Sequence, residues 1–259
     1  MADVGWLGLA TSLLLVAAAV AISAWRGLGL ERSIAWAAAR ALVQLLLVGL
    51  ALELVIDPGR PLVLSFAWLA LMVAFAADVA RRRAPEVPGL FPLAALAFAA
   101  SGVVTLGVLF GLGVFPLDGR TLVPVGGLMI GNAMTATVLA ARRVVDSLRD
   151  RREEVEARLA LGQPSGQAAR PYLRGALRTA LTPQIETTKA VGIVFLPGAM
   201  TGLILAGVDP LDAVLVQAVV MYLVLASTAV TTTVVAMGLL RRLFTPDHRL
   251  VRLPRPAER

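Results

Sequence analysis

The sequence predicts an all-α, polytopic membrane protein, with residues 1–259 forming a single transmembrane domain. Three observations predict this class. Of its 259 residues 58% are hydrophobic and only 16% are charged, whereas an average soluble domain has about 25% charged residues. The mean hydropathy is +0.80. Several apolar runs also reach the roughly 20 residues that a helix needs to cross the hydrocarbon core of a bilayer. A water-soluble globule is therefore excluded, and the lack of cysteine excludes disulfides and thiolate metal sites.

The apolar runs predict about seven membrane-spanning helices. In chain order they cover residues 6–25, 33–56, 61–80, 91–110, 122–141, 184–206 and 211–240. No basic residue precedes the first run, so we expect it to remain as a helix and not to act as a cleaved signal peptide. Pro197 and Gly198 are expected to kink the sixth helix or to leave one of its carbonyls unpaired, because proline lacks the backbone N–H and clashes with the preceding turn. With Gly202, they form a candidate hinge.

The arginines predict the orientation of the chain in the membrane. Arginine supplies all but one of the 24 basic residues, and it is concentrated after the first, third, fifth and seventh runs. By the positive-inside rule the N-terminus lies outside and the C-terminus in the cytoplasm, which requires an odd number of spans. The basic loops are expected to meet anionic membrane lipid. We expect no nucleic-acid partner, because Tyr172 is the only tyrosine in a basic loop. A multi-pass protein of the cell (inner) membrane follows.

One long polar connection, residues 142–182, is predicted to be a cytoplasmic helix–turn–helix excursion. Residues 142–161 are rich in good helix formers, with an apolar stripe at helical spacing. Gly162 and the following proline indicate the end of that helix, and a second short helix is expected over 167–181, closed by Thr182-Pro183. The excursion has two possible uses: a helix lying on the lipid surface, or a docking surface for a soluble partner.

Five segments together resemble the FetB/YbbM-type family of ABC-transporter permeases. They are Arg40-Ala-Leu-Val-Gln-Leu45, Gly131-Asn-Ala-Met-Thr135, Glu156-Ala-Arg-Leu-Ala-Leu-Gly162, Leu196-Pro-Gly-Ala-Met-Thr-Gly202 and Ile204-Leu-Ala-Gly-Val-Asp-Pro210. The resemblance implies a membrane subunit that pairs with a separate cytoplasmic ABC ATPase and works as a homodimer. The bacterial members of this family are described as iron exporters, and plant relatives are associated with aluminium tolerance.

The third of these segments is also similar to the coupling signature of ABC-importer permeases, Glu-Ala-Ala-x-x-x-Gly, at its first, second and seventh positions. The similarity implies that the excursion carries the contact with the ATPase. The proposed coupling residues are Glu156, Ala157, Gly162, Pro164 and Gly166. No cofactor is expected in this chain, whereas ATP and Mg are expected on the partner ATPase.

Polar side chains inside the apolar runs are candidates for the transport path, because they are costly in a membrane. Arg40 and Gln44 are one turn apart on the second run, and Asn132 and Thr135 are on the fifth. Each pair can serve as a structural clamp or interhelical bond, or can line the path or a dimer seam.

No metal site is predicted within one chain. His248 is the only histidine and lies in the tail, and the carboxylates Glu53, Asp78 and Glu186 do not share one depth in the membrane. A chelated iron species, an organic or lipid-like substrate, or a site between two copies fits these residues better than a bare ion.

The chain is not expected to be an enzyme by itself. It has no Gly-x-x-x-x-Gly-Lys-Ser/Thr loop to hold a nucleotide phosphate, and its single lysine is Lys189. Two functions remain: the permease subunit of an ABC transporter that exports iron or another small solute, or an ATPase-independent secondary transporter or channel. A retinal-binding photoprotein is disfavoured, because no lysine lies deep in the seventh run.

Overall fold

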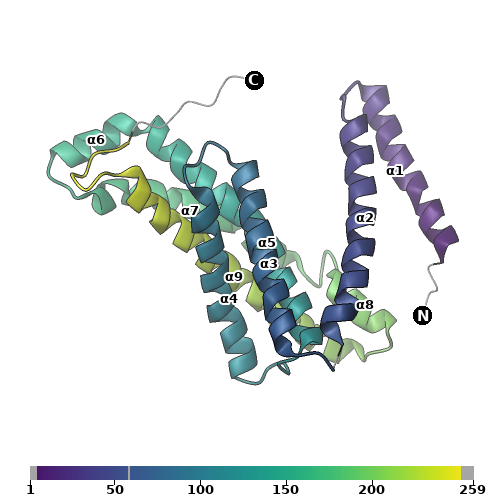
Figure 1. Ribbon diagram of the computed structural model, residues 1–259. Helices are drawn as coiled ribbons and strands as arrows, with labels where there is room; N and C mark the ends of the chain where they lie inside the picture. The colour runs from purple at the N-terminus through teal and green to yellow at the C-terminus, as the bar shows by residue number, and fades with distance from the viewer. Residues whose placement is uncertain (1–4, 58, 252–259) are drawn as a thin grey trace.

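The computed structural model describes residues 5–57 and 59–251, and every regular element in these ranges is an α-helix (Figure 1). The helices are α1 (Trp6–Arg26), α2 (Glu31–Ile56), α3 (Leu62–Arg83), α4 (Leu90–Gly111), α5 (Gly119–Asp150), α6 (Arg152–Ala160), α7 (Ser165–Ala190), α8 (Gly198–Leu205) and α9 (Pro210–Leu243). Six of them, α1 to α5 and α9, are long and apolar enough to cross a membrane. The predicted all-α membrane class is confirmed. The membrane orientation stays a prediction, and Arg252, Arg255 and Arg259 lie outside the described residues.

The helices form two parts, a hairpin of α1 and α2 and a bundle of α3, α4, α5, α7 and α9 (Figure 1). In the hairpin the Ser23 hydroxyl donates to Glu31 Oε1 at 2.8 Å and accepts from the Leu30 N–H at 3.1 Å. Apart from its partner helix, α1 has no packing contact among the described elements, and α2 meets only α3 and α5. No residue in the most apolar 18-residue stretch of α2 is buried. The hairpin therefore presents most of its surface to its surroundings.

The bundle is held by close packing of small side chains between α4, α5 and α9. Gly238 of α9 lies so near α4 that a Cβ there would meet Leu93 Cδ1 at 2.2 Å, and a Cβ at Gly126 of α5 would meet Leu69 Cδ1 of α3 at 2.5 Å. The Ser101 hydroxyl donates to the Ser227 carbonyl across the α4–α9 contact. Because lipid is as apolar as leucine, helices in a membrane associate through such close packing and a few polar bonds.

Arginines hold the turn between α3 and α4. Arg242 of α9 donates to the Gly89 carbonyl at 2.8 Å, and Gly89 has φ 63°, a conformation that favours glycine. Arg142 of α5 forms an ion pair with Glu86 at 3.0 Å and donates to the Arg83 carbonyl. Between these contacts Ala84 is fully buried and only 4% of Val87 is exposed. Two long helices thus fix the same turn with basic side chains.

The sixth predicted span, 184–206, is wrong as a single helix. α7 runs through Pro183, where a break was predicted, because its other face packs on α5 and α9 and the proline ring lies on the exposed side. The helix ends only at Ala190, before Gly192 with φ 87°. Residues 191–197 then form an irregular connector to α8, so seven continuous spanning helices are not observed within the described residues.

The predicted helix over 142–161 is also divided. α5 continues out of its membrane-spanning part to Asp150, and α6 begins after a break at Arg151. The backbone of Arg151, with φ −108° and ψ 29°, departs from helical values and ends the α5 hydrogen-bond pattern. The break turns α6 away from α5 so that it can pack against α7 (Figure 1).

Candidate functional site

The predicted excursion consists of the end of α5, the whole of α6 and most of α7. Its apolar stripe packs as the spacing predicted: Val144, Leu148 and Val155 are fully buried, and Leu159 is partly buried. α6 has only nine residues, too few to be a stable helix in isolation. Burial of Val155 against the bundle core therefore helps to hold α6 in place.

The turn after α6 is a Schellman motif, the left-handed ending that many helices use. Gly162 has φ 84°. Its N–H donates to the Leu159 carbonyl at 2.9 Å, and the N–H of Gln163 donates to the Arg158 carbonyl at 3.1 Å. These bonds satisfy two carbonyls that the helix end leaves free. Pro164 follows as the N-cap of α7. The predicted glycine cap followed by proline is confirmed.

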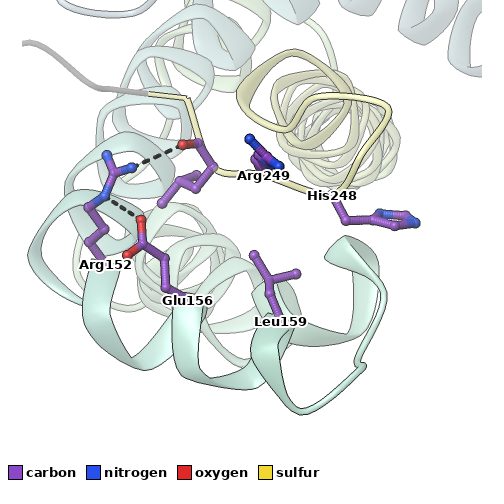
Figure 2. A pocket seen from close by; sticks show the side chains of 6 residues that line it. Arg152, Glu156, Leu159, His248 and Arg249 are labelled. Atoms are coloured by element: carbon purple, nitrogen blue, oxygen red, sulfur yellow. Dashed lines mark hydrogen bonds and ion pairs between the residues drawn. The ribbon is translucent and has the colours of Figure 1, made fainter.

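The segment that follows α9, residues 244–251 and called the tail below, lies on α6 and is held there by Arg152 (Figure 2). The Arg152 guanidinium forms an ion pair with Glu156 at 2.6 Å and donates to the Leu250 carbonyl at 3.1 Å. In the tail the Thr245 N–H donates to the Arg249 carbonyl, and Leu250 is buried, with only 5% of its surface exposed. The residues around this contact line a cavity of about 340 Å³. Because the tail continues directly from α9, Arg152 connects α6 to a membrane-spanning helix.

A second contact joins the tail to the start of α7. His248 Nδ1 accepts a hydrogen bond from the Ser165 N–H at 3.3 Å and lies 3.1 Å from the Ser165 hydroxyl. Ser165 is the first residue of α7, and its N–H is one of those that a helix N-terminus leaves without a partner in the helix. His248 thus acts as a cap from another part of the chain.

α6 and α7 are also joined by a charged hydrogen bond. The Tyr172 hydroxyl donates to Glu154 Oε2 at 2.8 Å, and Arg151 forms an ion pair with the same carboxylate. The Tyr172 bond, with Arg151, lowers the pKa of Glu154 below its usual range. Partial burial, followed by the Glu154 bond, raises the pKa of Tyr172. At neutral pH the carboxylate is ionised and accepts both bonds, which strengthens the α6–α7 contact.

The five proposed coupling residues lie together on one surface. Glu156 and Ala157 are on α6, Gly162 and Pro164 form the turn, and Gly166 is in the first turn of α7; all five are exposed. Glu156 uses its carboxylate to hold Arg152, so its role includes the structure of α6 itself.

The four proposed path or seam residues are exposed, but they are not brought into contact with one another. Asn132 and Thr135 lie on an open stripe of α5, where Asn132 Nδ2 donates to the Leu128 carbonyl at 2.8 Å. Arg40 and Gln44 lie on α2. At 100° per residue, they are about 140° around the helix from the partly buried side that packs on α1. In Figure 1 the bundle is on the side of α2 away from α1.

The three proposed hinge residues lie at the start of α8. The expectation that Pro197 and Gly198 kink a continuous helix is wrong, because Pro197 is the N-cap of α8 and Gly198 is its first residue. A residue before proline avoids the helical region, so the irregular connector is the natural conformation here. A Cβ at Gly198 or Gly202 would meet no described atom within 4 Å. The hinge role stays a prediction.

Sequence reasoning missed several polar residues of the fold. Arg152 was not singled out, because its partners are carbonyls about a hundred residues away in the tail. Gln217 of α9 is buried with a side-chain oxygen that has no partner among the described residues; its presence in an apolar run was the available signal. Within the described residues no group of three His, Asp or Glu side chains could hold a metal ion.

Comparison with known proteins identifies what this chain is similar to. Residues 6–244 match the family described as "Uncharacterised protein family (UPF0014)". The UPF0014 membrane protein STAR2 of Oryza sativa subsp. japonica is 39% identical over 88% of this chain and 80% of its own length. The UPF0014 membrane protein YjkA of Bacillus subtilis is 34% identical over 95% and 98%. The "Probable iron export permease protein FetB" of Escherichia coli is 31% identical over 94% and 93%. No solved structure matches the chain significantly.

Proposed function

Because this chain belongs to the UPF0014 family of membrane proteins, we propose that it is the permease subunit of an ATP-driven ABC transporter. The substrate is iron or another small solute, exported from the cytoplasm, as the name of the Escherichia coli relative indicates for that protein. ATP and Mg bind to a separate cytoplasmic ATPase. The chain itself carries no catalytic residue in this proposal.

The observation that carries the proposal is the exposed turn between α6 and α7. A coupling element must project from the membrane domain, must keep its shape under load, and must be connected to the helices that move. The turn projects with its five residues exposed. Its shape is fixed by the Schellman bonds at Gly162, and its connection to α9 runs through Arg152 and the tail. Movement of an ATPase against this turn would therefore reach two bundle helices, α7 and α9.

A homodimer completes the proposal. ATPases of this class close on nucleotide as pairs, so two permease copies are needed to receive the movement of both. The exposed surface of α2 supports this, because Arg40 makes no hydrogen bond or ion pair with the described residues although it is about 14 Å from the start of α2 at 1.5 Å per residue. A charged side chain at that depth requires a protein partner or water. A dimer seam or path along Arg40 and Gln44 supplies one.

The test is ATP hydrolysis that co-purifies with the tagged chain from membranes of its own organism. Ala157→Arg places a bulky charge on the proposed contact without breaking a bond, and we expect at least a tenfold loss of vanadate-sensitive hydrolysis, since an unpaired buried charge costs several kcal/mol. Asp247→Ala is the control, because Asp247 is exposed on the tail at the same end of the molecule. Hydrolysis that is undiminished in Ala157→Arg, or absent from the wild-type preparation, would contradict the proposal.

A secondary transporter or channel is the second candidate, and the broken segment between α7 and α8 favours it. Discontinuous helices with irregular backbone near the middle of the membrane form ion and substrate sites in many secondary transporters. A transport measurement with the chain reconstituted alone in liposomes distinguishes the ABC permease from the secondary transporter or channel. Transport driven by a substrate or ion gradient without any ATPase would support the second candidate and overturn the first.

A further inference from the structure

The exposed side of α7 is mostly polar, with Ile185 as its one exposed large apolar residue, although α7 packs along two membrane-spanning helices, α5 and α9. Its inner side is made of small residues, with Ala169, Ala176 and Ala180 all buried. At 100° per residue, Arg178 and Thr182 lie about 160° around the helix from these alanines, as does Lys189. An apolar span would show the opposite pattern, with its larger apolar residues outward.

Charges on this side are mostly positive and mostly unpaired. Arg174 and Arg178 make no side-chain hydrogen bond or ion pair with the described residues. Lys189 Nζ lies 3.0 Å from Glu186 Oε1, and both side chains are more than 60% exposed. The side therefore carries three positive charges against one negative charge over α7. Thr182 stands between them, and its hydroxyl donates to the Arg178 carbonyl at 2.8 Å, so it does not add an unsatisfied group.

The end of α7 lies between the two ends of the bundle, and not level with either. In Figure 1 the connector after α7 is well short of the turns that join α2 to α3 and α4 to α5, while α8 continues beyond it. The connector is open to its surroundings, with Ile193 93% exposed and Val194 76% exposed. Irregular backbone at membrane depth is tolerated only where protein covers it or where it lines a water-filled cavity.

We propose that the exposed side of α7, from Arg174 to Lys189, lines a water-filled path that selects anionic substrates. Rings of arginine and lysine are the usual lining of anion pores, as carboxylates are of cation pores. Arg40 and Gln44, which are exposed on α2 away from its partly buried side, add one more positive charge and an amide to the exposed polar groups of the chain. A bare metal cation is repelled by this lining, whereas a metal held in an anionic chelate, or an organic anion, is attracted. The inference rests on the permease function proposed above and gives its substrate class.

The lack of cysteine in the chain allows a direct test. In Thr182→Cys the single thiol reacts with water-soluble methanethiosulfonates, one carrying an anionic sulfonatoethyl group and one a cationic trimethylammonioethyl group. A local potential of about +1 kT per unit charge speeds the reaction with the anionic reagent by a factor of about e and slows the reaction with the cationic reagent by the same factor. The ratio of the two reaction rates therefore rises about sevenfold over that of a free thiol. We expect at least this rise in open membrane fragments, and a fall toward the free-thiol ratio when Arg178→Gln is added.

Each other outcome overturns the inference. A preference for the cationic reagent means that α7 lies on anionic lipid headgroups, which concentrate cations. No reaction with either reagent means that lipid or a second copy covers the side. Leu96→Cys on α4, at a leucine that is 61% exposed, is the control and should react with neither. Because the reaction needs no nucleotide and no ATPase, its failure leaves the co-purification test of the proposed function unaffected.

Discussion

Replacement of Gly162 by alanine should loosen α6, and the size of the effect follows from the backbone. Gly162 has φ 84°, and a Cβ there would meet no described atom within 4 Å. The cost of Gly162→Ala is therefore one of backbone conformation alone, about 1–2 kcal/mol for a left-handed L-residue. Gly162→Asn should cost less, because asparagine tolerates this conformation.

Gly166 is the matched control. It is also exposed with no atom near its Cβ position, but it lies in the first turn of α7 with an ordinary φ. Gly166→Ala should stabilise α7 by up to about 1 kcal/mol, since alanine forms helices better than glycine does. Two chemically identical substitutions four residues apart should thus act in opposite directions.

Amide hydrogen exchange over α6 and the first turn of α7 measures both effects. A loss of 1–2 kcal/mol raises the exchange of locally opening amides roughly 5- to 30-fold, and we expect this over 152–162 in Gly162→Ala. Exchange in Gly166→Ala should slow or stay the same. Unchanged exchange in Gly162→Ala, or faster exchange in Gly166→Ala, would refute the assignment of the Schellman turn as the element that fixes this surface.

Three further predictions use other contacts. Arg152→Ala should free the tail from α6 and speed proteolysis of residues 244–251, and an unchanged cleavage rate would argue against the tail contact. The pKa of Glu154 is lowered in the folded chain, so the carboxylate should keep its contact with Tyr172 at any pH above the ordinary carboxyl pKa. The contact should be lost as the pH falls through the lowered pKa. Tyrosine fluorescence measured against pH checks this. Gly238→Val should reduce the free energy of unfolding by about 1–3 kcal/mol through overpacking and so lower the melting temperature. Gly107→Val, with open space at its Cβ position, should not lower it.

The sequence predicted the membrane class and most of the helices, because length and hydropathy decide both. The runs at 6–25 and 91–110, for example, match α1 and α4 to within one residue at each end. The apolar stripe of the excursion was also correct, since Val144 and Val155 follow helical spacing and are buried. These features are local, and local patterns can be read from one chain.

The two main errors have different causes, one in tertiary contacts and one in the local backbone. Thr182-Pro183 has the local pattern of a helix end, but packing of α7 on α5 and α9 carries the helix past it. The apolar composition of 184–206 reads as a span, whereas Gly192 and Pro197 divide it. In the candidate site the helix end at Gly162 was predicted, but the support of α6 and α7 by Arg152 and His248 depends on residues 248–250, far away in the sequence.

The arginines at the α3–α4 turn have a structural role in addition to the role of positive charges in membrane insertion. During insertion only the number and side of such charges matter, and lysine serves as well as arginine. In the finished protein Arg142 and Arg242 must also reach backbone carbonyls with a planar, forked donor group. A lysine at either position would keep the positive charge that directs insertion but would lose the forked donor group that holds the α3–α4 turn. Selection on biogenesis and selection on the folded state therefore act on the same two side chains, and only the second distinguishes arginine from lysine.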